Sequence, residues 1–86
     1  MALTVEQLQE AGAILTVAET VRAAAAQLRQ RFPGIQASVV DPFDMKGETP
    51  AVKTGDRAIY LMSSDGHCWS ITQDPARASA FVLTGA

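Results

Sequence analysis

The spacing of hydrophobic positions changes near Pro33. Before this residue, apolar side chains recur every three or four positions, which is typical of helices. After it they alternate or form short runs bounded by Gly, Pro and Asp, which is typical of strands. This order predicts an α+β domain in which two N-terminal helices precede a small antiparallel sheet of about three to five strands.

The first helix has a clear start signal. Thr4 is a good N-cap, and Gln7 follows three residues later, which completes a capping box. Leu3 and Leu8 have the spacing of a hydrophobic staple across this cap. The helix is predicted to cover residues 5–11, with Gly12 either ending it or loosening it.

A second capping box is predicted from Thr16 to Glu19, with a helix over residues 17–31 stopped by Pro33. This long helix is expected to pack on one face of the sheet. Its apolar stripe consists of Val21, Ala25, Leu28 and Phe32.

The strands are marked by alternation and by turn residues. Residues 35–40, 51–53 and 80–84 are predicted strands, and Asp74 before a proline opens a short helical turn. The clearest feature is a central hairpin from Arg57 to Thr72, reversing at Asp65-Gly66 in a type I′ turn.

A two-residue turn fixes the register of this hairpin. It places Met62 opposite Trp69 and Tyr60 opposite Ile71 on one face, and Leu61 on the other. Because the first face carries the larger side chains, we expect it to be the better buried face.

Composition narrows the function. The 86 residues predict a single domain, residues 1–86, and seven Lys and Arg against nine Asp and Glu argue against nucleic-acid binding. The arc Arg22, Arg29 and Arg31 is interpreted as a solvated helix face. The sequence contains no uninterrupted apolar run of about 18 residues, so no membrane span is predicted. The N-terminus does not resemble a signal peptide, and the single cysteine favours a reducing cytoplasm.

Candidate chemistry is sparse. His67 and Cys68 are the only residues of their kinds, and as neighbours on a strand they are expected to point to opposite faces. Asp41, Asp44 and Glu48 lack the spacing of a calcium loop. We therefore expect no metal, no cofactor and no enzymatic activity. A thiol enzyme acting through Cys68 is the remaining catalytic alternative.

The loop over residues 42–50 contains the candidate protein-binding residues. Phe43 and Met45 are apolar in a segment expected to be exposed, so they either fold under the sheet or anchor a partner. Trp69 poses the same choice between core and interface. The full candidate set is Phe43, Asp44, Met45, Lys46 and Trp69.

A small-molecule site is the other alternative. It would use the Tyr60/Trp69 face, with a pocket between that face and the long helix. Self-association also stays open, because the strand over residues 35–40 or the last strand could leave an unpaired sheet edge.

Two resemblances accompany these expectations. The segment Gly55 to Phe81, with its Tyr60-Leu61 and Asp65-Gly66 pairs, resembles one repeat of a fascin-type β-trefoil and implies a shared hairpin. In length, helix-first order and the region from Tyr60 to Ala80, the chain resembles small proteobacterial nitrogen-fixation-associated proteins. These include the nitrogenase-associated factor that docks on the molybdenum–iron protein. The resemblance implies an accessory role, protective or chaperone-like, without chemistry of its own.

Overall fold

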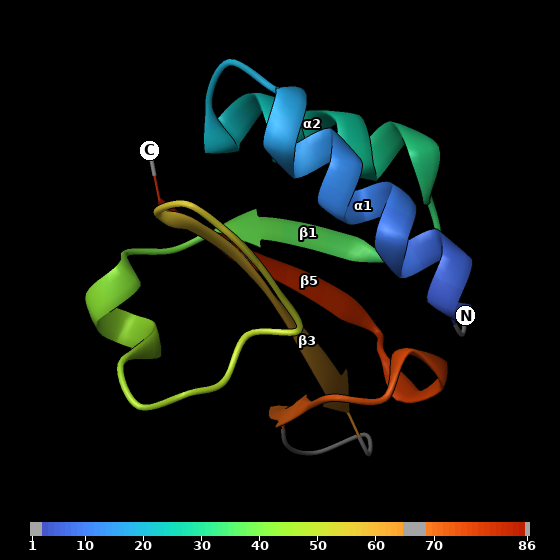
Figure 1. Cartoon of the computed structure of the whole chain (residues 1–86). Coiled ribbons are helices and arrows are strands. Elements are labelled where there is room, and N and C mark those ends of the chain that lie inside the picture. Colours follow the sequence, from blue (N-terminus) through green and yellow to red (C-terminus); the bar gives the residue numbers. More distant parts are fainter. Residues whose placement is uncertain (1–2, 65–68, 86) are drawn as a thin grey trace.

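The computed structural model describes residues 3–64 and 69–85, and it has helices first and strands afterwards (Figure 1). This confirms the α+β class. The elements are α1 (Val5–Val17), α2 (Val21–Arg31), β1 (Gln36–Val39), the 3₁₀ helix η1 (Pro42–Met45), β2 (Val52–Thr54), β3 (Arg57–Ser64), β4 (Trp69–Thr72), the 3₁₀ helix η2 (Pro75–Arg77) and β5 (Ala80–Thr84).

The sheet is mixed, so the prediction of an antiparallel sheet is wrong at one strand pair. Four of the five strands have the order β1-β5-β3-β2, and the fifth, β4, also pairs with β3. The pair β1 and β5 is parallel, whereas β2, β4 and β5 all run antiparallel to β3. The last strand is therefore central and leaves no free edge, which explains why all five of its residues are buried. This open sheet is not a β-trefoil.

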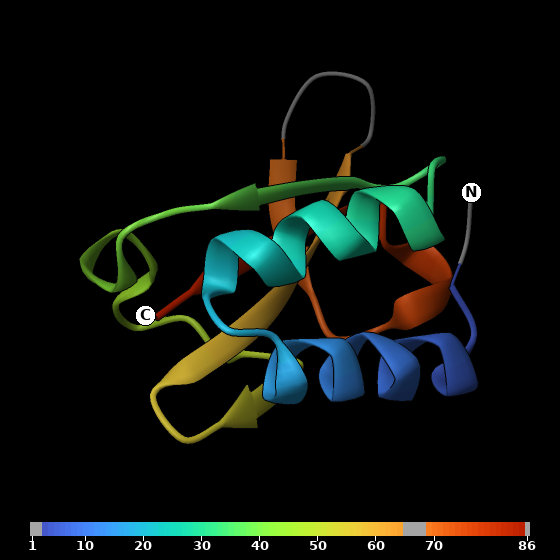
Figure 2. The same cartoon turned by 90° about the horizontal axis from the view of Figure 1, so that it is seen from above.

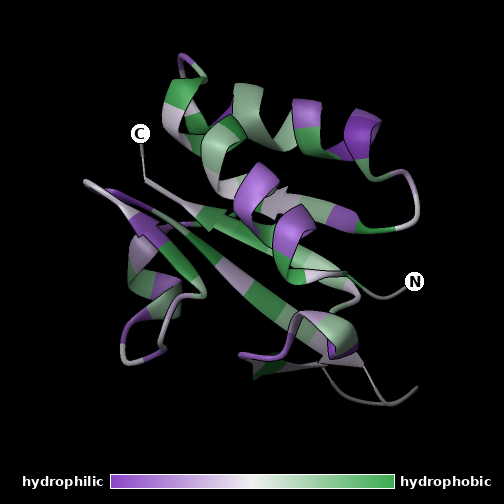
Figure 3. Ribbon diagram, turned by 45° about the vertical axis from the view of Figure 1, so that its right-hand side comes forward, coloured by the Kyte–Doolittle hydropathy of each residue, from purple (hydrophilic) through white to green (hydrophobic). Residues whose placement is uncertain are grey.

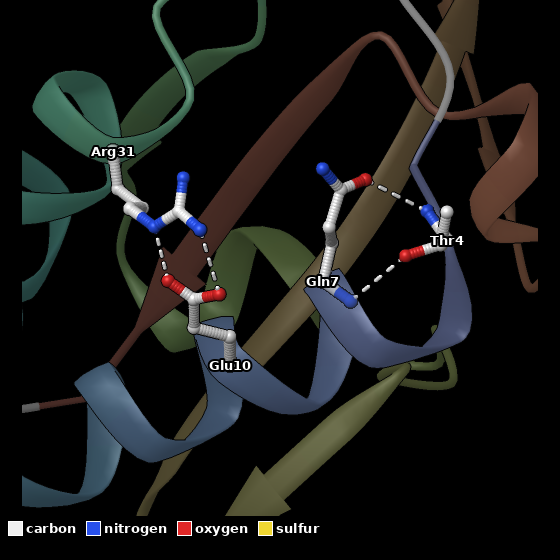
Figure 4. A network of polar contacts seen from close by, with 4 residues as sticks. All are labelled: Thr4, Gln7, Glu10 and Arg31. Carbon is white, nitrogen blue, oxygen red and sulfur yellow. Dashed lines mark hydrogen bonds and ion pairs between the residues drawn. The ribbon is translucent and has the colours of Figure 1, made fainter.

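Helix α1 starts as predicted and ends later. Thr4 Oγ1 accepts from the Gln7 amide at 3.1 Å, and the Gln7 side chain accepts from the Thr4 amide at 2.9 Å (Figure 4). The predicted end at Gly12 is wrong, because α1 continues to Val17. Gly12 is buried where α1 crosses β2, and a Cβ added there would lie 3.1 Å from Val52 Cγ1. This glycine allows close packing and does not act as a stop signal.

Helix α2 begins later than predicted. Its N-cap is Thr20, whose Oγ1 accepts from the Ala23 amide at 3.0 Å. The predicted cap Thr16 instead lies inside α1 and donates to the Gly12 carbonyl at 2.9 Å. Two helices are present as predicted, but the second is not the long one, because α1 has 13 residues and α2 has 11.

The two helices lie side by side on the same face of the sheet (Figures 1 and 2). An ion pair between Glu10 of α1 and Arg31 of α2 joins their exposed surfaces (Figure 4). Neither helix of the described ranges is both long and apolar enough to cross a bilayer.

The main core lies between the helices and the sheet. The predicted stripe of α2 is buried there, and Phe32 packs on Phe81 of β5 with ring centroids 5.8 Å apart. Figure 3 shows hydrophobic residues along the central strands. The sheet contributes Ile59, Leu61, Phe81 and Leu83 to this core.

The expectation that the Tyr60 face would be the better buried one is therefore wrong. Strand β5 explains why: Phe81 and Leu83 pair with Leu61 and Ile59, and these four side chains form a continuous apolar surface under the helices. A single strand with large residues on both faces does not reveal which face is covered.

The hairpin register is shifted by two residues from the prediction. Met62 pairs with Ile71, and Ser64 pairs with Trp69, so the predicted pairing of Met62 with Trp69 is wrong. A shift of two preserves the alternation of faces, so Met62, Ile71 and Trp69 remain on one face as predicted. The Asp65-Gly66 turn, His67 and Cys68 lie outside the described residues.

Arg57, at the start of β3, caps the end of α1. Its Nη1 donates to the carbonyls of Leu15 at 2.8 Å and Ala18 at 2.7 Å, and its Nη2 donates to the carbonyl of Glu19 at 2.8 Å. The last carbonyls of a helix have no intrahelical partners. The last turn of α1 contains no basic residue of its own, so a strand supplies the charge that the helix terminus favours.

We expect Arg57→Met to lower the free energy of unfolding by about 2–3 kcal/mol, because charge-assisted hydrogen bonds are lost and helix carbonyls are left unpaired. Arg57→Lys should recover only part of this, because an ammonium lacks the fork of a guanidinium. The matched control is Arg77→Met, in an exposed residue, with a change below about 0.5 kcal/mol. Urea unfolding followed by circular dichroism measures all three, and equal stability of the Arg57 and Arg77 variants would contradict the capping role.

Gly85 provides a second stability test, because it has φ +115° and packs against the start of β3. An added Cβ would lie 2.7 Å from the Asp56 carbonyl oxygen and 2.9 Å from Arg57 Cα. We expect Gly85→Ala to cost about 2–3 kcal/mol from backbone strain plus this clash. Gly47→Ala, at φ +87° with no atom within 4 Å, isolates the strain alone and should cost about 1 kcal/mol. Thermal unfolding of both variants would refute the clash if their Tm values fell equally.

Candidate protein-binding face

The sheet surface opposite the helices carries a second, smaller apolar cluster. Ala58, Tyr60 and Val82 are buried in it, and four partly buried side chains pack around them: Val40, Met45, Met62 and Ile71. Beside the cluster is a hollow of about 320 Å³. We call this hollow and its rim the open face, lined by Gln36, Ser38, Val40, Met45, Met62, Trp69, Ala80 and Val82.

The 3₁₀ helix η1 brings Met45 to the open face. Asp41 caps η1 by accepting from the Phe43 amide at 2.8 Å, and Pro42 occupies its first turn. Met45 packs against the second cluster and is half-buried. The proline and the Asx cap together explain why this loop forms a defined turn.

Phe43 does not fold under the sheet. Its side chain is 75% exposed, and the Lys46 ammonium lies 5.6 Å from the centroid of its ring. Asp44 and Lys46 are also exposed. Of the two alternatives for this loop, the core role therefore holds in part for Met45 and fails for Phe43.

Trp69 is 50% exposed and lines the hollow from the start of β4. A core role for this residue is therefore excluded, although its ring is half-covered. The structure brings Trp69 and Met45 to the same hollow from positions far apart in the sequence.

In the part of the chain that the structure describes, Tyr60 and Trp69 line two different hollows. Tyr60 is only 8% exposed and lines a separate hollow of about 310 Å³ together with Glu48, Lys53 and Asp56. The helices cover the opposite face of the sheet, so the expected pocket between the long helix and the Tyr60/Trp69 face is not formed.

Sequence reasoning missed Val40 and Val82, which line the hollow. It also missed Arg57, which binds the end of α1 on the other side of the sheet. The alternation of Ala80 and Val82 with Phe81 and Leu83 was the available signal for β5. This alternation assigns residues to the hollow only once β5 is known to lie between β1 and β3.

The open face is suited to apolar contact. Met and aromatic side chains are enriched at protein interfaces, and Met adapts its shape to irregular surfaces. Within residues 3–64 and 69–85, no three His, Cys, Asp or Glu side chains are grouped so that they could hold a metal ion.

We expect Phe43→Ser to change the free energy of unfolding by less than about 0.5 kcal/mol, because little of this ring is removed from water. Phe81→Ala is the comparison, since Phe81 is fully buried, and it should cost about 3–5 kcal/mol. Urea titrations of both variants test the assignment, which a loss above about 1.5 kcal/mol for Phe43→Ser would contradict.

Comparison with known proteins gives a family and no relative of known activity. A family model described as a family of unknown function (DUF6129) matches residues 10–86. No curated protein and no solved structure matches the chain. The matched range includes every strand of the sheet, so any proposal about function must come from the geometry of this fold.

Proposed function

The chain belongs to DUF6129, a family of unknown function, and we propose that it is a non-catalytic accessory protein. It binds a larger protein partner through the open face and through Phe43. The observation that carries the proposal is the exposure of two aromatic rings, Phe43 at 75% and Trp69 at 50%, in a chain with few aromatic residues.

Exposed rings of this kind favour a partner on energetic grounds. Burying apolar surface contributes roughly 25 cal/mol per Å², and aromatic rings supply large areas at a small loss of rotamer freedom. Met45 and Met62 lie beside Trp69 in the hollow and can adapt to a side chain inserted there. Asp44 and Lys46 flank Phe43 and would form the polar rim of the interface.

The first partner to test is the nitrogenase molybdenum–iron protein. Support for it comes from the resemblance in length, element order and the region from Tyr60 to Ala80. The proposal includes a cytoplasmic location, which a single cysteine favours.

A small-molecule-binding module is the second candidate, and the hollow of about 320 Å³ at Trp69 is the observation in its favour. This volume is near the lower limit of ligand pockets. Since Trp69 is the only tryptophan, a ligand bound there should quench or shift its fluorescence. A flat response across a metabolite panel removes this candidate.

The protein-partner proposal is tested by comparing the tagged chain with two variants in capture experiments. In Phe43→Ser/Trp69→Ser the exposed rings are removed. The control variant is Val17→Ser, which removes an apolar side chain of α1 that is 77% exposed and thus about as exposed as Phe43. Each protein is mixed with purified molybdenum–iron protein and, separately, with native lysate from nitrogen-fixing cells.

We expect the wild type and Val17→Ser to retain the same partner in stoichiometric amount, and the double variant to lose at least about 90% of it, as removing interface anchors does. Circular dichroism establishes that the double variant is folded. Equal retention by all three proteins would exclude the open face, and the absence of any stoichiometric partner would contradict an accessory role. Retention from lysate without binding to the molybdenum–iron protein would reject that partner alone.

A further inference from the structure

Strand β1 is at one end of the sheet, and among residues 3–64 and 69–85 it has one side without a neighbouring strand. The amides of Gln36 and Val40 donate to the Ser79 and Leu83 carbonyls, at 3.3 and 2.9 Å. Alternate residues of a strand bond to opposite sides, so the backbone groups of Ala37 and Val39 face away from β5. We call this row of outward groups the β1 edge.

Two arginines of α2 flank the β1 edge. Arg29 Nε donates to the outward carbonyl of Ala37 at 2.9 Å. Hollows lie on either side of this contact: one is lined by Arg29 and residues 33–38, and the other by Arg22, Ala25, Arg29, Ser38 and Val39. Neither lining contains an Asp or a Glu.

These arginines are not used in ion pairs within the part of the chain that the structure describes, where the one recorded ion pair joins Arg31 to Glu10. Arg22 and Arg29 are two helical turns apart on α2, a rise of about 10 Å. They therefore present two positive charges along the length of β1.

The two sides of β1 differ in character. Ala37 and Val39 pack toward the helices with the main core, whereas Gln36 and Ser38 line the hollow of the open face. A strand added beside β1 would have the same alternation. Its side chains on one face would meet Arg22 and Arg29, and those on the other face would extend the apolar open face.

We propose that the β1 edge binds an extended segment of a partner protein, with carboxylates at alternate positions and apolar residues between them. The segment adds a strand to the sheet through Ala37 and Val39. The Arg29 guanidinium then exchanges the Ala37 carbonyl for a carboxylate, and the freed carbonyl accepts from a backbone amide of the segment. The inference rests on the proposed function only in assuming a protein partner; it does not depend on Phe43 or Trp69.

Charge argues against a second copy of this chain as the occupant. Antiparallel pairing of two β1 strands centred on Ser38 would place Ala37 opposite Val39 of the second copy. Arg29 would then face Arg22 of the second copy, and both pairs of like charges would oppose association. An acidic segment removes this repulsion and neutralises both arginines.

The test uses the full chain, labelled with ¹⁵N, and four blocked hexapeptides. The probe alternates Glu and Val, and a second peptide alternates Lys and Val. A third has the probe's composition in two blocks, Glu-Glu-Glu-Val-Val-Val. The fourth is the probe with N-methyl groups on alternate residues, which removes backbone donors and leaves the side chains unchanged. Chain variants are Arg22→Glu/Arg29→Glu, its control Arg77→Glu, and Phe43→Ser/Trp69→Ser.

We expect the alternating acidic peptide to shift the Ala37 and Val39 amide resonances and to bind about tenfold more tightly than the other three peptides. Arg22→Glu/Arg29→Glu should lose this binding and gain binding of the Lys peptide, whereas Arg77→Glu and Phe43→Ser/Trp69→Ser should behave as the wild type. The gained Lys binding shows that the reversed variant is folded.

Three results would overturn the inference. Equal binding of the acidic and N-methylated peptides would exclude strand addition. Peptide binding lost in Phe43→Ser/Trp69→Ser and kept in the arginine variant would assign the contact to the open face. Concentration-dependent shifts of Ala37 and Val39 without peptide would assign the β1 edge to a second copy. The two proposals can fail separately. If the peptide binds as expected but Phe43→Ser/Trp69→Ser still captures the partner, this inference holds and the proposed use of the open face fails.

Discussion

The Arg57 guanidinium links the helical layer to the sheet. It reaches from the first residue of β3 to three carbonyls in the last turn of α1 and just after it, so one side chain both caps a helix and fixes it on a strand. The chain reverses into α2 directly after these carbonyls, and α2 therefore starts from a position that Arg57 defines. Gly85 supports the same corner, because its missing side chain lets the backbone after β5 approach Arg57.

The two faces of the sheet are covered unequally. Both helices pack on the face made by Ile59, Leu61, Phe81 and Leu83, and on the opposite face η1 packs against the second cluster through Met45. A domain of this size has few residues with which to cover a sheet twice. The second apolar cluster, with Met45 and Trp69 at its border, therefore has no helix packed over it among the described residues. This lack of a second helical layer is enough to leave an apolar surface that a partner could cover.

The β1 edge and the open face are neighbouring surfaces, since Gln36 and Ser38 line hollows on both. Free strand edges promote unwanted pairing, and Arg29 limits this at β1 by occupying the Ala37 carbonyl and by adding positive charge. The same charge selects which strand could be admitted. Protection against self-pairing and selection of an acidic partner thus follow from the same side chain.

The candidate residues were accessible from sequence because apolar side chains in a Pro- and Gly-bounded loop are conspicuous. Phe43 and Met45 follow Asp41-Pro42 in a segment that was predicted only as a loop, and the structure forms the 3₁₀ helix η1 there. The sequence could not predict that one of these side chains is partly buried and the other exposed. Met45 is covered by Val82 and its neighbours, whereas Phe43 has no such cover, and only the path of η1 across the sheet separates them.

The sequence by itself determined the features that depend on near neighbours: the Thr4 cap, the stripe of α2, the strand positions and the helix-first α+β order. Tertiary structure decided what depends on distant segments. Gly12 was tolerated in α1 because Val52 packs against it, and Arg57 supplied a helix cap from a strand some forty residues away. The pairing of β5 with β3 decided which face of β3 the helices cover. A local pattern describes both faces of a strand equally well, so only the neighbouring strand could decide which face is buried under the helices.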